Sequence, residues 1–446
     1  MYKGDTTMKS KIACSYVLGL VVGLSLLLVM GCSLDIINPN SPTEEAVLTT
    51  GQGIMGLAIG MQQYYSIGVV QTMVLTPGLT SHEVAVNRTF SGLFELETGG
   101  SALLEDNANL LNLWSNCLKV VAMASQLEAS APDIAMDNGT RSGVLALAYL
   151  HKAMALGVLA QSFEQSPIDV STDTPPQFRP RAQVIAEALR LLDLASQVIK
   201  TTPTSTEFKT RVLGSGFDLQ NTISAYQARF NLMAGQYQKA VDAANATSPS
   251  ATSKFVYDDK SRNPMYDAVT GLGRWAAIDL FGTDLTDPKD GRLAFYLTPS
   301  TKLSDPSKIP IDVIKGFFDD PLKPIPVYLP GELRLIKAEA YVRLGNLTAA
   351  VTEINAIRTK TAAQDPFGVG TSLPAYSGAV TLDALLLEIY TQRCAEMFWS
   401  GLRWEDSRRL GRPGPGTAKP ERNREFYPYP VQERVNNPNT PANPLK

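Results

Sequence analysis

The chain has 446 residues, in which 40 lysines and arginines nearly balance 43 aspartates and glutamates, for a formal net charge of −3. This balance, without a polybasic segment, argues against nucleic acid or an anionic lipid surface as the partner. With two histidines and no HExxH, CxxC, GxSxG or P-loop motif, the sequence lacks the residues for zinc hydrolysis, thiol redox chemistry, an α/β-hydrolase triad or P-loop phosphate binding, and we expect neither a metal nor a cofactor.

The N-terminus carries the features of an export signal. Lys9 and Lys11 precede an apolar stretch, 12–30, whose dense core is shorter than the roughly 20 residues that a membrane-spanning helix needs. The stretch ends in "VMGC", the pattern of a lipobox, in which a branched residue and a small residue precede the cysteine that receives lipid. We therefore expect residues 1–31 to be removed and Cys32 to be lipidated. An ordinary secretory signal or a transmembrane anchor with an incidental cysteine is the alternative.

A short segment rich in Pro, Asn and Ser follows Cys32, and the apolar spacing then becomes helical. "GQGIMG" (residues 51–56) has the glycine spacing of a dinucleotide fingerprint, but that motif needs a preceding strand and an acidic residue about 20 positions on. Residues 70–79 contain no acid and the surroundings have a helical pattern, so we reject nucleotide binding. The spacing predicts helices over 110–127, 143–163 and 180–199.

Two segments 110 positions apart resemble each other. "ARFNLMAGQYQKAVDAAN" from Ala228 aligns with "AEAYVRLGNLTAAVTEIN" from Ala338, and Gly235 falls on Gly345. A helix, a glycine-containing turn and a second helix with small residues form the tetratricopeptide arrangement. Two generic helical hairpins are the alternative, and in either case such pairs stack because each leaves an apolar face uncovered. We predict an all-α fold, a superhelix of tetratricopeptide-like helix pairs.

Residues 251–330, between the two pairs, form an excursion that is dense in Gly, Pro, Asp and aromatic residues and has little periodicity. A long irregular segment on a helical scaffold is a common location for a binding surface. Aromatic rings can stack on sugar rings while nearby carboxylates and amides bind the hydroxyls. We predict ligand contacts at Trp275, Tyr266 and Phe281, with core packing as the alternative role for each ring.

The carboxylates Glu405 and Asp406 are the pair that a glycosidase would use. However, Asp406 lies three residues from Arg403 and three from Arg409, the spacing of ion pairs on a helix. We therefore expect these acids to be structural and the protein not to be an enzyme. Cys117 and Cys394 are too far apart in sequence to indicate a disulfide framework. One disulfide or two separately buried side chains both remain open.

Several motifs in order along the chain resemble the SusD/RagB family of nutrient-binding outer-membrane lipoproteins. "ELRLIKAEAYVRLGNLTAAVTEINAIR" is similar to a family motif, and "YPYPVQERVNNPN" to another near the C-terminus. The most specific match is "RCAEMFWSGLRWEDSRRLG", where Gln392 and Ser400 stand in place of the family's glutamates. It matches through Arg393, Glu396, Gly401, Arg403, Trp404, Asp406 and Arg409.

This resemblance implies an outer-membrane lipoprotein, lipid-anchored and facing the cell surface, which captures an oligosaccharide or a peptide. Its partner would be a SusC-like TonB-dependent transporter, over which it would close as a lid. We expect a signal peptide (1–31), an N-terminal region with helix pairs (32–250), a ligand-side excursion (251–330) and a C-terminal region (331–446). A surface glycosidase with an Asp/Glu pair, and a helical-repeat adaptor that binds only protein, are the alternatives.

Overall fold

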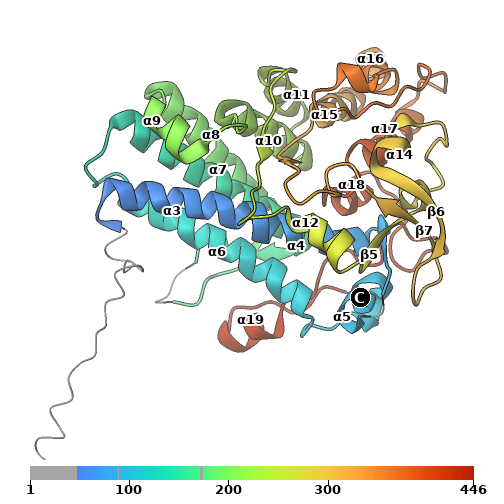
Figure 1. Ribbon diagram of the computed structural model, residues 1–446, viewed down its shortest axis with the longest axis horizontal. Coiled ribbons are helices and arrows are strands. Elements are labelled where there is room, and N and C mark those ends of the chain that lie inside the picture. Colours follow the sequence, from blue (N-terminus) through green and yellow to red (C-terminus); the bar gives the residue numbers. More distant parts are fainter. Residues whose placement is uncertain (1–47, 89, 171–173, 446) are drawn as a thin grey trace, which may run out of the picture. The chain divides into compact units, whose positions relative to one another are not determined.

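Figure 1 shows the computed structural model, which describes residues 48–88, 90–170 and 174–445. The predicted signal peptide (1–31) and the predicted lipidation at Cys32 lie outside the described residues. Within them the chain is mainly helical, as predicted. The longer helices are α3 (Gly51–Tyr64), α4 (Val70–Thr80), α5 (Ser91–Thr98), α6 (Ala108–Ser130), α7 (Asn138–Ser162), α8 (Arg181–Thr201), α10 (Leu219–Met233), α11 (Tyr237–Ala246), α15 (Pro330–Arg343), α16 (Leu347–Arg358), α17 (Leu382–Glu396) and α18 (Arg403–Arg409).

The N-terminal helices form one side of the scaffold. Helices α3 and α4 are joined by a single π-helical turn, Tyr65–Val69, and they pack against α6 and α7. The glycines of "GQGIMG" lie inside α3, which excludes the strand-and-turn geometry of a dinucleotide site. Helix α7 is the one helix among the described residues that is long and apolar enough to span a membrane. However, 89% of its apolar window is buried inside the fold, so α7 is the central core helix.

Both predicted tetratricopeptide pairs are present. Helices α10 and α11 form the first pair and α15 and α16 the second, and each turn contains a glycine with positive φ, +70° at Gly235 and +81° at Gly345. The small residues that face the partner helix, Ala228, Ala240, Ala338 and Ala350, are fully buried. Helix α8 contacts α10, α11 contacts α15, and α15 contacts α17, so the pairs stack in chain order from green to orange in Figure 1. The predicted superhelix is confirmed.

The excursion, residues 251–330, is more regular than the sequence predicts. It holds short helices and the strands β5 (Trp275–Ile278), β6 (Leu297–Leu303) and β7 (Pro310–Ile314), which join β1 (Val84–Val86) in an antiparallel sheet of order β1-β5-β7-β6. This sheet cannot be predicted from the sequence, because strands of three to seven residues are too short to establish a period of two. The short helices there are α12 (Pro264–Tyr266), α13 (Asp279–Gly282) and α14 (Gly291–Tyr296).

The remaining short elements close the fold. Two-residue strands pair β2 (Gln165–Ser166) with β3 (Arg179–Pro180) and β4 (Lys254–Phe255) with β8 (Ile325–Pro326). Short helical segments are α9 (Thr206–Phe208), α19 (Val431–Asn436), the π-helical turns Lys209–Leu213 and Asp267–Gly271, and the 3-10 turns Gly100–Ala102 and Ala362–Gln364. Cys117 and Cys394 are both buried and unbonded, which decides in favour of separate buried thiols.

The C-terminal segment after α18 returns to the N-terminal helices. The backbone N–H of Tyr427 donates to the carbonyl of Ser162 at the end of α7 (2.9 Å). The indole N–H of Trp114 on α6 donates to the carboxylate of Glu433 on α19 (3.0 Å). Because these contacts join residues more than 250 positions apart, the C-terminal segment fixes the first helices of the scaffold to the last.

The glycine of the second tetratricopeptide turn provides a test of this fold. We expect Gly345→Ala to lower the free energy of unfolding by about 1 kcal/mol, because an alanine there would be held at positive φ. The matched control is Gly56→Ala, at an exposed helical position in α3 with open space around it, which should raise the free energy of unfolding by about 0.5 kcal/mol. Urea denaturation of both variants measures the difference, and effects of equal sign would contradict the assigned turn.

Candidate functional site

The acids of the C-terminal motif are structural. Asp406 accepts hydrogen bonds from Arg393 (2.8 Å) and Arg409 (2.8 Å), and Glu405 accepts from Arg181 (2.5 Å) and Arg408 (2.8 Å). Burial alone would raise the pKa of both carboxyls, but the surrounding arginines hold both pKa values below their ordinary range. The predicted pairing of Asp406 with Arg409 is therefore confirmed, and neither acid is available as a proton donor near neutral pH.

The predicted pairing of Arg403 with Asp406 is not formed. Arg403 instead donates from Nε to the hydroxyl of Tyr390 (3.0 Å) and from Nη1 to the backbone carbonyl of Phe281 (3.2 Å). The spacing on α18 allows the pair, but Arg403 is the first residue of the helix and its side chain is directed toward the excursion. It thereby fixes the excursion to α17 and α18.

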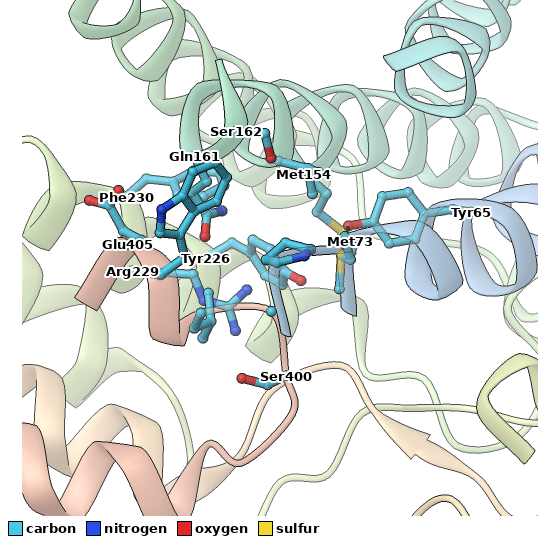
Figure 2. A pocket seen from close by; sticks show the side chains of 15 residues that line it. Tyr65, Met73, Met154, Gln161, Ser162, Tyr226, Arg229, Phe230, Ser400 and Glu405 are labelled. Carbon is cyan, nitrogen blue, oxygen red and sulfur yellow. Dashed lines mark hydrogen bonds between the residues drawn. The ribbon is translucent and has the colours of Figure 1, made fainter. Parts of the chain in front are cut away.

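The interior cavities are too small for a ligand. Figure 2 shows a cavity of about 20 Å³ at which Met73, Met154 and Phe230 converge with Arg229 and Glu405. A space of this size holds one water molecule. The guanidinium of Arg229 is already occupied, because it donates to both carboxylate oxygens of Glu332 at 2.6 and 2.7 Å. A neighbouring, mainly apolar cavity measures about 60 Å³, and we assign both cavities to core packing.

Neither histidine is placed for nucleophilic catalysis. His151 is fully buried, its Nδ1 lies 3.0 Å from the carbonyl oxygen of Leu147, and burial lowers its pKa to about 4. His82 contacts the carbonyl oxygen of Pro420 at 3.2 Å through Nδ1. Among the residues that the structure describes, no three His, Cys, Asp or Glu side chains form a group that could hold a metal ion.

The three predicted ligand contacts occupy different environments. Phe281 has no exposed surface and packs between Tyr296 and Phe398, with ring centroids 6.1 and 4.9 Å away. Trp275 is 7% exposed and pairs with Val86 in the sheet. Large rings in a segment that rests on a core are themselves buried, so neither is retained as a ligand contact. Tyr266 keeps a partly exposed ring, with the guanidinium of Arg262 5.2 Å from its centroid.

Tyr266 belongs to a surface cluster that we call the arginine–aromatic patch. It comprises two ring–guanidinium pairs, Tyr266 with Arg262 and Phe90 with Arg274, together with Arg88 and Leu272. The backbone N–H of Arg274 donates to the carbonyl of Ala268 (3.4 Å), which connects the two pairs through one loop. Strands β1 and β5 are antiparallel with Val86 opposite Trp275, so the residues that follow β1 lie beside those that precede β5. Asn87 holds these two segments together. Its backbone N–H donates to the carbonyl of Arg274 (2.7 Å), and its side-chain amide donates to the carbonyl of Gly273 (3.0 Å).

The patch exposes rings and guanidinium groups together. Phe90 is 47% exposed, and the guanidinium of Arg274 lies 4.4 Å from its ring centroid. Gly273 has φ +56°, and a Cβ there would lie 3.9 Å from the guanidinium of Arg88, which places Arg88 beside the residue that precedes Arg274. Leu272, 45% exposed, adds an apolar side chain to the same loop.

The loop that carries Tyr266 is held from below. Asn263 is buried and caps α12, accepting hydrogen bonds from the backbone N–H groups of Met265 and Tyr266, and its amide donates to the carbonyls of Phe317 (2.9 Å) and Lys323 (2.8 Å). The carbonyl of Asp267 accepts from the N–H of Leu272 (2.7 Å) and closes the loop. The patch is therefore presented by a backbone that is anchored on both sides.

A groove of about 700 Å³ lies at the other end of β5. Its volume falls within the range of small-molecule sites. Asp279, Ser300 and Asp312 line it together with prolines and leucines of the excursion. The carboxylate of Asp312 accepts from the backbone N–H of Ser300 (2.8 Å), and burial, with a smaller effect from Asp279, raises its pKa. Patch and groove are thus both built mainly from the excursion.

Comparison with known proteins identifies the fold. No family model matches the sequence, and no curated protein is detectably similar to it. Among solved structures, a SusD superfamily protein from Bacteroides thetaiotaomicron VPI-5482 is 16% identical, with a TM-score of 0.68 over 89% of this chain and 100% of that one. The chain has the SusD fold.

Two further structures with this fold carry names that describe a ligand. A putative sugar binding protein from Bacteroides vulgatus ATCC 8482 is 16% identical, with a TM-score of 0.67 over 89% of this chain and 98% of that chain. A SusD-like carbohydrate binding protein from the same organism is 13% identical, with a TM-score of 0.65 over 82% of this chain and 84% of that one. Sequence identities of 13–16% support the inference of a shared fold and do not support the inference of a shared ligand.

Of the six residues of the arginine–aromatic patch, the sequence predicts only Tyr266 as a ligand contact. Arg88 and Phe90 lie 186 and 184 positions before Arg274, and nothing local marks them as its neighbours. The three residues of β1 are too few to be recognised as a strand, and their pairing with β5 is a tertiary contact. An exposed phenylalanine beside an arginine is a frequent sequence feature, so the single chain offers no specific signal for this site.

In this SusD fold, one buried acid joins the first strand to the C-terminal motif. Glu83 has no exposed surface, accepts from the backbone N–H of Trp399 (2.9 Å), and its own carbonyl accepts from the N–H of Ile278 in β5 (3.1 Å). Burial raises the pKa of Glu83 to about 7, although the nearby guanidinium of Arg403 lowers it. Gly282 must stay a glycine here, because a Cβ would lie 1.8 Å from the carbonyl oxygen of His82.

The raised pKa of Glu83 predicts a pH-dependent stability. Between pH 4.5 and 7 the folded protein keeps a proton on Glu83 that the unfolded chain releases, so this group lowers the free energy of unfolding as pH rises through that window. Glu83→Gln removes the titration, and its stability relative to the wild type should increase from pH 5 to about pH 7 and level off above that. Urea denaturation at each pH measures this, with the exposed Glu207→Gln as control. Parallel profiles for wild type and Glu83→Gln would contradict it.

Proposed function

We propose that this chain is a lipid-anchored outer-membrane protein that captures oligosaccharides and delivers them to a TonB-dependent transporter. The observation that carries the proposal is the SusD fold, matched over 89% of this chain by a protein named as sugar binding. The lipobox at Cys32 and the tetratricopeptide-like scaffold are consistent with it. In this proposal the chain binds the oligosaccharide and closes over the transporter as a lid, and the transporter carries the oligosaccharide across the membrane.

The arginine–aromatic patch is the ligand contact that we propose. Two partly exposed rings, Phe90 and Tyr266, come from different segments and are held by anchored loops. Each ring that stacks on a sugar contributes on the order of 1 kcal/mol, so several contacts are needed for useful affinity. The groove beside Asp279 and Asp312 lies at the other end of β5 and offers hydroxyl acceptors for an extended ligand.

Binding without catalysis fits the chemistry of the acids. A glycosidase needs one carboxyl that donates a proton and one that stays ionised, both facing a substrate. Glu405 and Asp406 are buried in arginine pairs, and the cavity that Glu405 borders, about 20 Å³, is too small for a sugar. A protein-only adaptor could use the exposed rings, but it would leave the groove at the other end of β5 without an occupant. Glycan capture therefore gives a role to both the exposed rings of the patch and the groove, which neither alternative does.

Ligand binding tests the proposal directly. The soluble chain beginning after Cys32 should bind at least one oligosaccharide without hydrolysing it, as measured by glycan-array screening followed by calorimetry. Phe90→Ala and Tyr266→Ala should each weaken binding about 5-fold, because each removes one stacking surface worth about 1 kcal/mol. The matched control is Tyr237→Ala, a partly exposed ring on α11. Hydrolysis of the bound glycan, or a barrel partner with no glycan or peptide ligand, would replace the proposal by one of its alternatives.

Anchoring is tested separately at Cys32. Expressed with its signal peptide in a bacterium with an outer membrane, the chain should fractionate with that membrane together with a TonB-dependent barrel in mild detergent. Cys32→Ala removes the thiol that would carry lipid and should shift the protein to the soluble fraction. Cys117→Ala, a buried thiol, is the control. Unchanged membrane association of Cys32→Ala would contradict lipid anchoring.

A further inference from the structure

We propose that the arginine–aromatic patch selects acidic oligosaccharides, those whose sugars carry carboxylate or sulfate groups. The inference rests on the proposed function, since it names the class of ligand for the same site. Its basis is the charge and position of three arginines, of which Arg262 lies at the ring of Tyr266, Arg274 at the ring of Phe90, and Arg88 beside Gly273.

The arginines of the patch differ from those of the interior in their partners. Inside the fold, guanidinium groups are paired with carboxylates at short distance, as Arg229 is with Glu332 (2.6 Å) and Arg409 with Glu339 (2.8 Å). Within the described ranges, neither Arg88 nor Arg274 has a carboxylate partner. Their charge is therefore available to a ligand.

The third arginine is only weakly engaged. Arg262 lies 3.5 Å from the carboxylate of Asp267, and both side chains are about half exposed. Solvent screening makes a pair of this kind worth little. An anion that offers better geometry than Asp267 can therefore recruit Arg262.

The guanidinium groups of Arg274 and Arg262 lie 4.4 and 5.2 Å from the ring centroids of Phe90 and Tyr266, close enough for cation–π attraction. A guanidinium that lies over a ring covers the ring face with its own plane and keeps its N–H donors at the edge of that plane. Carboxylate and sulfate oxygens accept such donors in pairs, and this charge-assisted contact is about twice as strong as a neutral hydrogen bond. The sugar ring of the same ligand can then contact the uncovered part of Phe90 or Tyr266.

The acids near the patch do not cancel this charge. Asp305 lies beside the end of β1, where its N–H donates to the carbonyl of Val86 (3.2 Å), but its carboxylate is paired with Lys308 at 2.7 Å. Glu97 is buried and accepts from the N–H of Val86 (2.8 Å) and the hydroxyl of Ser307. The patch thus carries three arginines, and Asp267 is the acid paired with one of them, while the exposed Asp258 and Asp259 precede Arg262 and the whole chain is net negative. A positive site on a negative protein favours anions locally.

The test compares matched oligosaccharides of one length by calorimetry on the soluble chain. Oligogalacturonates supply carboxylates, chondroitin sulfate oligosaccharides supply sulfates, and malto-oligosaccharides and xylo-oligosaccharides supply neither. We expect at least one acidic series to bind 10-fold or more tightly than the neutral series. Its affinity should fall as the salt concentration rises from 50 to 500 mM, because screening weakens exposed charge pairs.

Variants assign the effect to the patch. Arg88→Gln and Arg274→Gln should each weaken acidic binding about 10-fold, and each should weaken the binding of the acidic series by a larger factor than that of the neutral series. Arg274→Lys keeps the charge but loses the planar donor pair, so it should fall between wild type and Arg274→Gln. Arg190→Gln, at an exposed arginine on α8 that is paired with Glu187, is the matched control and should change nothing. Thermal melting checks that every variant is folded.

The outcomes separate this inference from the proposed function. Neutral glycans that bind as tightly as acidic ones, with both Gln variants unchanged, would overturn the acidic class and leave glycan capture standing. Acidic peptides that bind through Arg88 and Arg274 while no saccharide binds would overturn the saccharide class. If the chain bound no glycan at all, the proposed function itself would be overturned.

Discussion

The structure depends on a buried charge cluster around Glu396, at the end of α17. Its carboxylate is fully buried and accepts from Arg292 of the excursion (3.1 Å) and from Lys360 (2.6 Å). A buried charge is costly unless it is paired with good geometry, and removing one partner leaves an uncompensated charge. Arg292 meets this condition, because Asp290 (2.6 Å) and the amide oxygen of Gln392 (2.6 Å) occupy its other donors. The cluster thus fixes the excursion to the helical scaffold.

The cluster also explains why residue 392 is a glutamine and residue 331 a glycine. Gln392 stands where the related motif has a glutamate, and as a neutral acceptor it completes the shell of Arg292 without a further negative charge. Gly331 opens α15 directly against Glu396, where a Cβ would lie 1.7 Å from the carboxylate oxygen. A glutamate at position 392 would add a negative charge beside Glu396, and a side chain at position 331 would collide with the Glu396 carboxylate. The site around Glu396 therefore tolerates neither added charge nor added bulk, and it fixes the positions of α14, α15 and α17.

The buried cluster around Glu396 also fixes the position of the proposed ligand surface, because that surface is built mainly from the excursion. The excursion would otherwise be a long loop with large conformational freedom, which binding would have to restrict at a cost in affinity. Arg292 holds one end of the sheet, and Glu83, through Trp399 and Ile278, holds the strand from which the patch extends. Phe90, Tyr266 and their arginines are therefore presented in place, so that little ordering is needed when a ligand arrives.

The sequence by itself determined the helices, the two tetratricopeptide pairs and the pairing of Asp406 with Arg409. These features are local, because a period of 3.6 residues, a glycine turn and a three-residue spacing are each complete within one or two helices. Only the tertiary structure decided that Phe281 and Trp275 are buried, that Arg403 is directed to Phe281, and that Arg88 and Phe90 lie beside Arg274. Strand pairing and burial join residues distant in the chain, and neither composition nor periodicity encodes which distant segment a short strand will meet.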